Sequence, residues 1–353
     1  MNSVQYSDKK SGDISAALLA HYDVHARILP WRAAPGSDTP NPYHVWLSEI
    51  MLQQTTVAAV KGYFEKFTSL WPGFAELAAA DEADVLAAWA GLGYYARARN
   101  LHKCAHEVLS RHDGQLPQDE AKLLKLPGIG AYTAAAIAAI AFHRRAVVVD
   151  ANIERVVSRL FMIGQPLPAA KPAIRSAMDR ITPEIRSGDF AQAMMDLGAG
   201  VCSVKSPLCN ICPLAPHCAA YQAGQAEQFP VKPPKKAKLL RRGIAYWAHR
   251  DGHVLLVRRD AKGMLAGMRA LPDDRWTARQ DGDGEPPFAA HWTLSNKIVQ
   301  HSFTHFTLQM RIAVAEGPRE AEYGEYWPMN SLDKAGLPTL FSKAVSAILA
   351  ERV

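Results

Sequence analysis

Four cysteines lie close together near residue 210 and have the residue type and spacing to bind a metal centre. They follow the pattern Cys-x6-Cys-x2-Cys-x5-Cys at Cys202, Cys209, Cys212 and Cys218. Zinc ribbons and fingers usually join two close pairs across a longer gap, whereas one compact loop of four thiolates suits a cubane whose irons each take one thiolate. The spacing therefore favours one [4Fe-4S] cluster over zinc, with chance clustering as the remaining alternative.

The loop between the first two of these cysteines carries Lys205 and reaches Pro207 before the second one. A lysine on such a loop can present a cation to a phosphate group, which would give the cluster a role in positioning DNA. A redox role uses the same ligands, so the sequence leaves both roles open.

Glu49 lies among apolar neighbours and is a candidate general acid. Residues 50–52 are Ile, Met and Leu, and a helix through this segment would place Glu49 on one face with Trp46 and Gln53. Ionising a carboxylate in apolar company is costly, so its pKa should rise. A shift of about two units would keep a usable proton near pH 6. The alternative is a glutamate on a solvated helix face.

Asp150 ends the apolar run AVVV and precedes the helical pattern ANIERVVSRLF. Aspartate is a favoured N-cap, and hydrogen bonds from the first-turn amides would also hold it ionised. The cap and a catalytic carboxylate are therefore compatible roles. An acid and a stabilising carboxylate are the pair that glycosidic cleavage requires, and Glu49 and Asp150 can supply it if the fold brings them together.

The segment AKLLKLPGIGAYTAAAIAAIAF predicts a helix, a tight turn and a second helix. Gly128 and Gly130 let the backbone approach another molecule closely. Amides at the start of the second helix point outward, where they can bind a phosphate without reading any base sequence. The same pattern also occurs in ordinary structural hairpins, so DNA binding is one of two interpretations.

The rest of the chain indicates two domains joined by a linker. Residues 13–221 have the composition and periodicity of almost continuous helix. Residues 224–242 are proline-rich and basic, which is typical of a linker. The runs GIAYWAH, HVLLVRR and FTLQMRIAVAE predict a small sheet, and FSKAVSAILAERV a closing helix. We therefore expect a mainly α domain (1–223), a linker (224–242) and a smaller α+β domain (243–353).

Length and charge agree with this division. At 353 residues and 48% hydrophobic content, the chain exceeds the size of a single core. Its 40 Lys and Arg against 34 Asp and Glu give a net charge of +6, compatible with a polyanionic partner.

The start of the chain lacks an apolar signal region, and the apolar runs are too short to span a bilayer. We expect a cytoplasmic protein associated with the bacterial nucleoid.

With these residues in place, the first part of the chain resembles the helix-hairpin-helix DNA glycosylases, and within them the MutY type of adenine DNA glycosylase. The resemblance rests on LPWR, VWLSEIMLQQT, GLGYYARARNL, LPGIGAYTAAAI and FAQAMMDLGAGVC, and continues into LLVRRDAKGMLAGMRALP and SFTHFTL. It implies a monomeric base excision repair enzyme on double-stranded DNA. Such an enzyme flips adenine out of a mispair with 8-oxoguanine or guanine and hydrolyses its bond to deoxyribose.

The resemblance also assigns roles. Glu49 is the acid that protonates adenine N7, and Asp150 stabilises the oxocarbenium-like sugar, by charge or by transient covalent attachment. Tyr132 stands where bifunctional relatives keep a Schiff-base lysine, which implies a monofunctional enzyme. Asn152 takes the position of the family's catalytic asparagine. The residues expected at the adenine pocket are Arg32 and Gln192, and the wedge residues that replace lost stacking are Gln54, Leu92 and Tyr94.

The C-terminal domain resembles a Nudix hydrolase fold, yet residues 271–285 lack the acidic metal-binding helix that hydrolysis needs. We therefore expect recognition without hydrolysis. Phe303, Thr304 and His305 match the Phe-Ser/Thr-His element that reads 8-oxoguanine in the family. The alternative for these three residues is an ordinary strand with alternating faces.

Two departures from the family pattern bear on activity. Ala151 replaces the usual glycine after Asp150, so the backbone there must accept a Cβ atom, and residues 33–42 form a longer loop. We expect activity to survive. The alternative function is a catalytically silent iron–sulfur DNA-binding scaffold. A lyase acting on oxidised pyrimidines would need lysine at position 132, and a pyrophosphatase would need the missing acidic helix.

Overall fold

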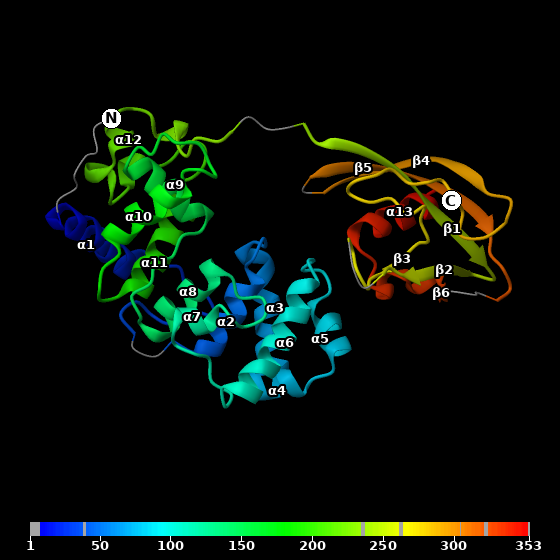
Figure 1. Ribbon diagram of the computed structural model, residues 1–353, viewed down its shortest axis with the longest axis horizontal. Helices are drawn as coiled ribbons and strands as arrows, with labels where there is room; N and C mark the ends of the chain where they lie inside the picture. The colour runs from blue at the N-terminus through cyan, green and yellow to red at the C-terminus, as the bar shows by residue number, and fades with distance from the viewer. Residues whose placement is uncertain are drawn as a thin grey trace. The chain divides into compact units, whose positions relative to one another are not determined.

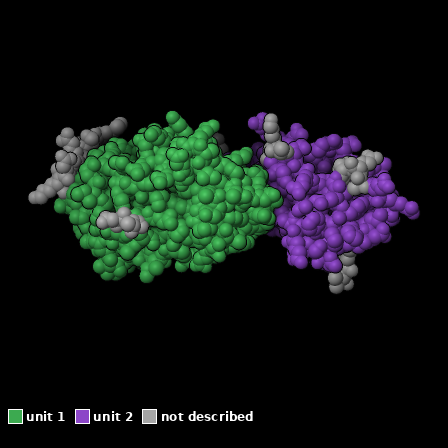
Figure 2. Space-filling view, turned by 90° about the horizontal axis from the view of Figure 1, so that it is seen from below, with its two compact units in different colours: residues 1–234 green, residues 235–353 purple. Residues whose placement is uncertain are grey.

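The structure is a computed structural model that describes residues 8–37, 40–233, 237–260, 264–303, 305–320 and 324–351. The chain divides into two compact units, Met1–Pro234 and Lys235–Val353, coloured separately in Figure 2. Each unit has a hydrophobic core of its own. Within the described ranges, no helix has both the length and the apolar character needed to cross a membrane.

The first unit consists of helices and turns, and its described residues contain no strand (Figure 1). This confirms the mainly α prediction. Its α-helices are α1 (Asp8–His25), α2 (Pro42–Met51), α3 (Val57–Leu70), α4 (Phe74–Ala79), α5 (Glu82–Trp89), α6 (Ala96–Arg111), α7 (Glu120–Leu123), α8 (Ala131–Phe142), α9 (Ala151–Leu160), α10 (Lys171–Ile181), α11 (Ser187–Asp196) and α12 (Ala219–Gln222). A π-helical turn, η1 (Leu197–Val201), and the short 3₁₀ turns η2 (Cys209–Ile211), η3 (Ala215–His217) and η4 (Ala226–Gln228) follow α11.

Helix α8 forms the centre of the first unit and packs against α2, α7 and α11 (Figure 1). Its residues 133–141 are all buried, as a helix that is apolar on every side requires. Helix α11 approaches it closely because Gly188 has no side chain. A Cβ atom there would lie 2.3 Å from the carbonyl oxygen of Ala139. This contact lies near the end of α8 and holds the helix whose first turn carries Tyr132.

Helix α2 positions Glu49. The helix begins after Asn41, whose Oδ1 accepts two first-turn amides at 2.9 and 3.3 Å, and Pro42 suits the first helical position. It ends at Met51, so Glu49 lies in its last turn. Gln53, predicted on the same helical face, lies just beyond the end of α2, although it lines the same cavity as Glu49.

The second unit is a sheet packed against one helix. The strand order is β3-β2-β1-β5-β4, with β6 also paired to β2; β1 and β5 are parallel and the other pairs antiparallel. Helix α13 packs against β4. The elements are β1 (Leu239–Arg250), β2 (His253–Arg258), β3 (Arg269–Ala270), β4 (Thr293–Ser302), β5 (Phe306–Glu316), β6 (Glu325–Pro328), the 3₁₀ turn η5 (Met329–Ala335) and α13 (Thr339–Leu349).

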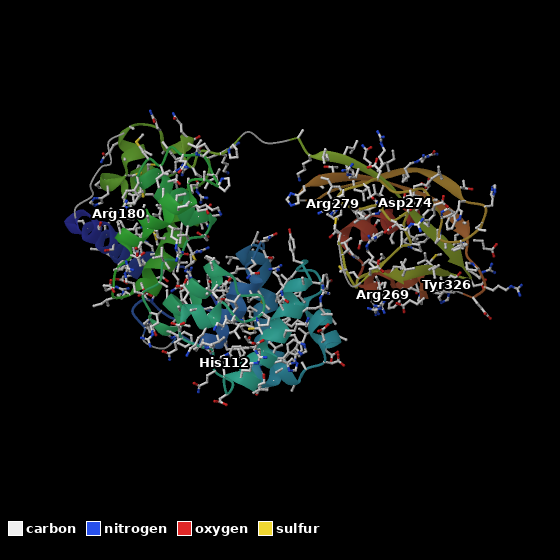
Figure 3. The ribbon with its side chains drawn as sticks, in the orientation of Figure 1. His112, Arg180, Arg269, Asp274, Arg279 and Tyr326 are labelled. Carbon is white, nitrogen blue, oxygen red and sulfur yellow. The ribbon has the colours of Figure 1, made fainter. Side chains whose placement is uncertain are left out.

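The runs predicted as strands and the predicted closing helix are confirmed as β1, β2, β5 and α13, whereas β3, β4 and β6 were not predicted. Strand β4 is mostly exposed, so it lacks the apolar alternation that signals a strand. The short β3 and β6 are joined through Arg269, labelled in Figure 3. Its Nε lies 2.5 Å from Glu325 Oε1, and its guanidinium lies 4.4 Å from the centre of the Trp327 ring.

The stretch predicted as a linker carries structure at both ends. Phe229 is buried, and its carbonyl accepts a hydrogen bond from Arg159 Nε at 3.1 Å. The carbonyl of Val231 accepts the amide of Leu167 at 2.9 Å. At the other end, β1 begins at Leu239, ahead of the expected boundary at 242. Proline and lysine content predicted a connection but not these attachments.

Candidate active site

A cavity of about 560 Å³ opens between the end of α2, the start of α8, the start of α9 and α11. This volume suits a small planar ligand such as a nucleobase. Seven of the residues predicted from the sequence line it, namely Arg32, Glu49, Gln54, Tyr132, Asp150, Asn152 and Gln192. The fold therefore brings together side chains that lie up to 160 positions apart in the chain.

Glu49 is buried in this cavity, and its pKa is raised to about 7. Burial is the largest cause, and the negative charge of Asp150 adds to it. A hydrogen bond from the Tyr132 hydroxyl and the positive charge of Arg32 act in the opposite direction. The predicted rise is confirmed, so Glu49 holds a proton through much of the neutral range.

Asp150 caps α9, as predicted. Its Oδ1 accepts the amide of Ile153 at 2.7 Å, and its Oδ2 accepts Asn152 Nδ2 at 3.0 Å. These bonds lower the pKa of Asp150, as expected, but the expectation that they set the net direction is wrong. The pKa of Asp150 is raised, because burial outweighs the hydrogen bonds and the charge of Arg155. Burial thus disfavours the charged form of both carboxylates, but only Asp150 has several hydrogen-bond donors that offset this effect.

Arg32 borders the cavity in a fixed orientation. Its Nη1 and Nη2 donate to the two carboxylate oxygens of Asp196 at 2.7 and 3.0 Å, and Arg27 Nε donates to the same carboxylate at 2.5 Å. Asp196 was missed from the sequence. The available signal was its spacing from Gln192, four residues earlier on α11, which places both on one helix face.

Asn152 connects the cavity to the cysteine loop through Arg155. Arg155 Nη2 donates to Asn152 Oδ1 at 2.9 Å and to the Gly198 carbonyl at 2.6 Å, and its Nε donates to the Cys202 carbonyl at 2.8 Å. Gly198 also lies against Asn152: a Cβ atom there would be 2.6 Å from Asn152 Cβ. Neither Arg155 nor Gly198 was predicted.

The four cysteines of the loop, Cys202, Cys209, Cys212 and Cys218, are all half-buried. The pKa values of the last three are raised, first by burial and also by the neighbouring thiols, so the sulfurs act on one another. Arg159, itself buried, donates from Nη1 to Cys202 Sγ at 3.2 Å. Among the described residues, no group of three or more His, Cys, Asp or Glu is arranged to hold a metal ion.

Two of the three predicted wedge residues have an unusual backbone. Gln54 has φ 57° and Tyr94 φ 50°, in the left-handed region that residues other than glycine seldom adopt. Tyr94 is 57% exposed. Leu92 differs, because it is 7% exposed and belongs to the core of the unit. The structure therefore does not bring Leu92 to the surface beside Tyr94.

The predicted hairpin is formed by α7, the turn at residues 124–130 and α8. Gly128 has φ 78°, and Gly130 precedes α8 without a side-chain cap. Gln53 Nε2 donates to the Gly128 carbonyl at 3.4 Å, which ties the hairpin to the end of α2. Lys205 is exposed on the cysteine loop and is not among the residues that line the cavity.

In the second unit, Phe303 and His305 of the Phe-Thr-His element lie between β4 and β5 and not in either strand. Phe303 stacks on Phe306, with ring centres 4.7 Å apart, and the Phe303 amide donates to the Phe306 carbonyl at 2.8 Å. His305 is exposed. Thr304 lies outside the described residues.

The structure shows where the two departures from the family pattern, Ala151 and the longer loop, lie relative to the cavity. Ala151 is exposed in the first turn of α9, has no positive φ and lines the cavity, so its Cβ atom is accommodated. The loop at residues 33–42 is tied to α11 by the Gly36 amide, which donates to Asp189 Oδ2 at 2.9 Å. Part of this loop lines a second cavity of about 280 Å³, which shares Ile140 and Gln192 with the first.

Comparison with known proteins finds relatives of both units. Residues 47–183 match the profile of the HhH-GPD superfamily base excision DNA repair proteins, and residues 243–347 match that of the NUDIX domain. Adenine DNA glycosylase from Mycolicibacterium smegmatis is 42% identical over 207 residues, covering 59% of this chain and 69% of the relative. The enzyme from Buchnera aphidicola subsp. Schizaphis graminum is 30% identical over 310 residues, covering 84% and 85%.

The chain belongs to the adenine DNA glycosylase family. The match to the human member is 40% identical over 219 residues but spans only 40% of that protein's length, and the mouse match spans 43%. Similar solved structures include a thermostable thymine-DNA glycosylase, with 27% identity, a TM-score of 0.54 and coverage of 61% of this chain and 98% of that one. An endonuclease III–DNA complex, with 22% identity and a TM-score of 0.52, covers 62% and 99% and supports the fold.

Proposed function

We propose that the protein removes adenine from mispaired duplex DNA by hydrolysing the bond between adenine N9 and deoxyribose C1′. One observation carries the proposal: a buried glutamate with a pKa of about 7 shares a base-sized cavity with a second carboxylate. Pairs of carboxylates in different environments divide the acid and the charged role between them. The names of the relatives supply the substrate class.

In the proposed reaction, Glu49 donates its proton to N7 of an adenine flipped into the cavity. As the C1′–N9 bond breaks, its electron pair stays with the base, which leaves as neutral adenine. The sugar becomes positively charged, and ionised Asp150 stabilises it. Water then adds to C1′ and returns a proton to Glu49, leaving free adenine and an abasic site.

The neighbouring side chains would keep these two groups in their roles. Tyr132 supplies a hydroxyl to Glu49 and no amine, so a Schiff base with the sugar cannot form there. Asn152 holds Asp150 from the side, and the ion pair with Asp196 holds Arg32 at the rim, with Gln192 nearby.

We assign the four cysteines as ligands of one [4Fe-4S] cluster, a donor set that suits this cofactor. The interacting thiols and the guanidinium of Arg159 beside Cys202 Sγ support the assignment, because a donor to a ligating sulfur stabilises the thiolate. When bound, the cluster would hold the loop in shape, and Arg155 would keep that loop in register with Asn152.

DNA contacts would come from several parts of the chain. The amides at Gly128 and Gly130 and the side chain of Lys205 would bind phosphates, while Gln54 and Tyr94 would fill the space left by the flipped base. The element at residues 303–305 would read 8-oxoguanine, through the exposed His305 above all. We expect the enzyme to act as a monomer on nucleoid DNA.

The test uses a labelled duplex with adenine opposite 8-oxoguanine, incubated with the purified protein and then divided into samples with and without hot alkali. A break in the adenine strand only after alkali is expected. A break without alkali would indicate lyase activity, and tight binding with no break in either sample would indicate the silent scaffold. Visible absorption that disappears on oxidation of the protein is expected from the cluster.

A second assay tests the recognition element. His305→Ala should lower the rate on adenine opposite 8-oxoguanine more than the rate on adenine opposite guanine. Equal losses on the two duplexes would remove the 8-oxoguanine role from this element. His253→Ala, at the half-buried start of β2 in the same unit, is the matched control and should change neither rate.

A further inference from the structure

Arg97 is a charged residue in an unfavourable local position that the proposed chemistry does not use. It lies in the first turn of α6, where the helix dipole is positive and a cation is disfavoured. Its guanidinium pairs with no carboxylate in the described part of the chain, and its Nε is buried without a hydrogen-bond partner. Contacts with other segments must therefore hold this side chain in place.

Those contacts reach the end of the helix that carries Glu49. Arg97 Nη1 donates to the carbonyl oxygens of Ile50 and Met51 at 3.2 and 2.8 Å. Both are carbonyls of the last turn of α2, at the negative end of that helix dipole, where a cation is favoured.

The other side of the same guanidinium holds two loops. Nη2 donates to Thr55 Oγ1 at 3.0 Å, one residue after Gln54, and to the carbonyls of Leu92 and Gly93 at 3.3 and 3.5 Å. The charge also lies 5.4 Å from the centre of the Tyr94 ring. Arg97 is thus bonded next to both non-glycine residues that have a left-handed backbone in this region.

A left-handed backbone at a residue with a side chain is strained and persists only where surrounding contacts enforce it. The guanidinium of Arg97 hydrogen-bonds to α2 and to the loops on either side of it, next to Gln54 and next to Tyr94. Its planar fork can bond several carbonyls in fixed directions, which a lysine ammonium cannot do.

We propose that Arg97 is a positioning residue that couples the loops carrying Gln54 and Tyr94 to α2, the helix of Glu49. It keeps Gln54 and Tyr94 in the conformation that fills the space of the extruded base. This inference rests on the proposed glycosylase function. Loss of Arg97 should therefore impair extrusion of a paired adenine and leave the chemistry on an unpaired adenine largely intact.

The experiment compares Arg97→Met with wild type under single-turnover conditions on two duplexes. One carries adenine opposite 8-oxoguanine, and the other carries adenine opposite a tetrahydrofuran abasic analogue, where no partner base opposes extrusion. We expect a loss of about 30-fold or more on the first duplex and less than about 3-fold on the second. The pH dependence on the second duplex should not change, because Arg97 does not act on Glu49.

Two further variants complete the design. Arg111→Met makes the same change at an exposed position in the last turn of α6 and should match wild type on both duplexes. Arg97→Lys should restore part of the lost rate, and it supplies the test if Arg97→Met lowers the thermal unfolding temperature enough to prevent assay. Equal losses on both duplexes, or a shifted pH profile, would overturn the coupling. Inactive wild type on both duplexes would instead refute the proposed function.

Discussion

Glu49 and Asp150 lie in one cavity, yet they sit at opposite kinds of helix end. Glu49 is in the last turn of α2, where the backbone presents carbonyls, whereas Asp150 precedes the first turn of α9, where the backbone presents amides. Burial raises the pKa of both. The backbone then offsets burial at Asp150 and not at Glu49.

The comparison shows how one cavity can hold a proton and a negative charge side by side. Glu49 receives one hydroxyl donor, from Tyr132, while Asp150 receives a backbone amide and the Asn152 amide group. Glu49 is also the more deeply buried of the two, so burial and the difference in donors together separate the acid from the charged group.

The largest effect is expected from Glu49→Gln, which keeps the shape of the side chain and removes its proton. The rate of adenine removal should fall by about 10²–10⁴-fold, the range typical of general acid catalysis. Binding of the mispaired duplex, measured by fluorescence anisotropy, should be retained. Glu65→Gln, at an exposed position on α3, is the control. Near-normal turnover by Glu49→Gln would remove it as the acid.

Asp150→Asn should lower the rate by about 10²–10³-fold, the range for losing one electrostatic contact to the transition state. Asparagine caps helices as well as aspartate does, so the melting temperature should stay within a few degrees of wild type. Single-turnover rates and thermal unfolding measure the two quantities. A large drop in melting temperature with little loss of rate would make Asp150 a structural cap only.

Ionised Glu49 should also lower the folding stability of the protein above neutral pH. Its pKa rises from 4.5 to about 7 on folding, so folding stability falls as pH increases from 4.5 to 7, and the full cost remains above that. The difference corresponds to about 3 kcal/mol. Glu49→Gln should therefore stabilise the protein in urea unfolding at pH 8 and change little at pH 4.5. Equal effects at both pH values would contradict the burial argument.

The smallest effects should be shifts in the pH profile of kcat/KM, whose high-pH limb reports on Glu49 and whose low-pH limb reports on Asp150. Adenine removal needs Glu49 protonated and Asp150 ionised, so kcat/KM should fall at high pH with an apparent pKa near 7 and again at low pH. Tyr132→Phe removes a bond that lowers the pKa of Glu49 and should move the upper limb upward by about one unit. Asn152→Ala should move the lower limb upward instead. Movement of the same limb in both variants would contradict the division of roles.

Local rules were enough to predict some features of the site. The cap at Asp150 follows from its own position before a helical pattern, and the raised pKa of Glu49 follows from its apolar neighbours in sequence. The net pKa direction of Asp150 was wrong, because its burial comes from elements distant in the chain.

Features that depend on tertiary contacts could not be predicted. The ion pair between Arg32 and Asp196 joins residues 164 positions apart. Arg97 acts through backbone carbonyls, which carry no residue signature. In the second unit, β4 is recognisable only once β5 pairs with it, because its outward residues break the apolar alternation.

The close approach of Gly198 to Asn152 affects how natural variants at position 198 should be interpreted. A methyl group at position 198 would occupy space that Asn152 already fills, and Arg155 takes the neighbouring carbonyl. An inherited change from glycine to alanine there looks conservative and leaves every catalytic side chain in the sequence. It should nevertheless be classed with the damaging alleles, since it displaces the residue that steadies Asp150.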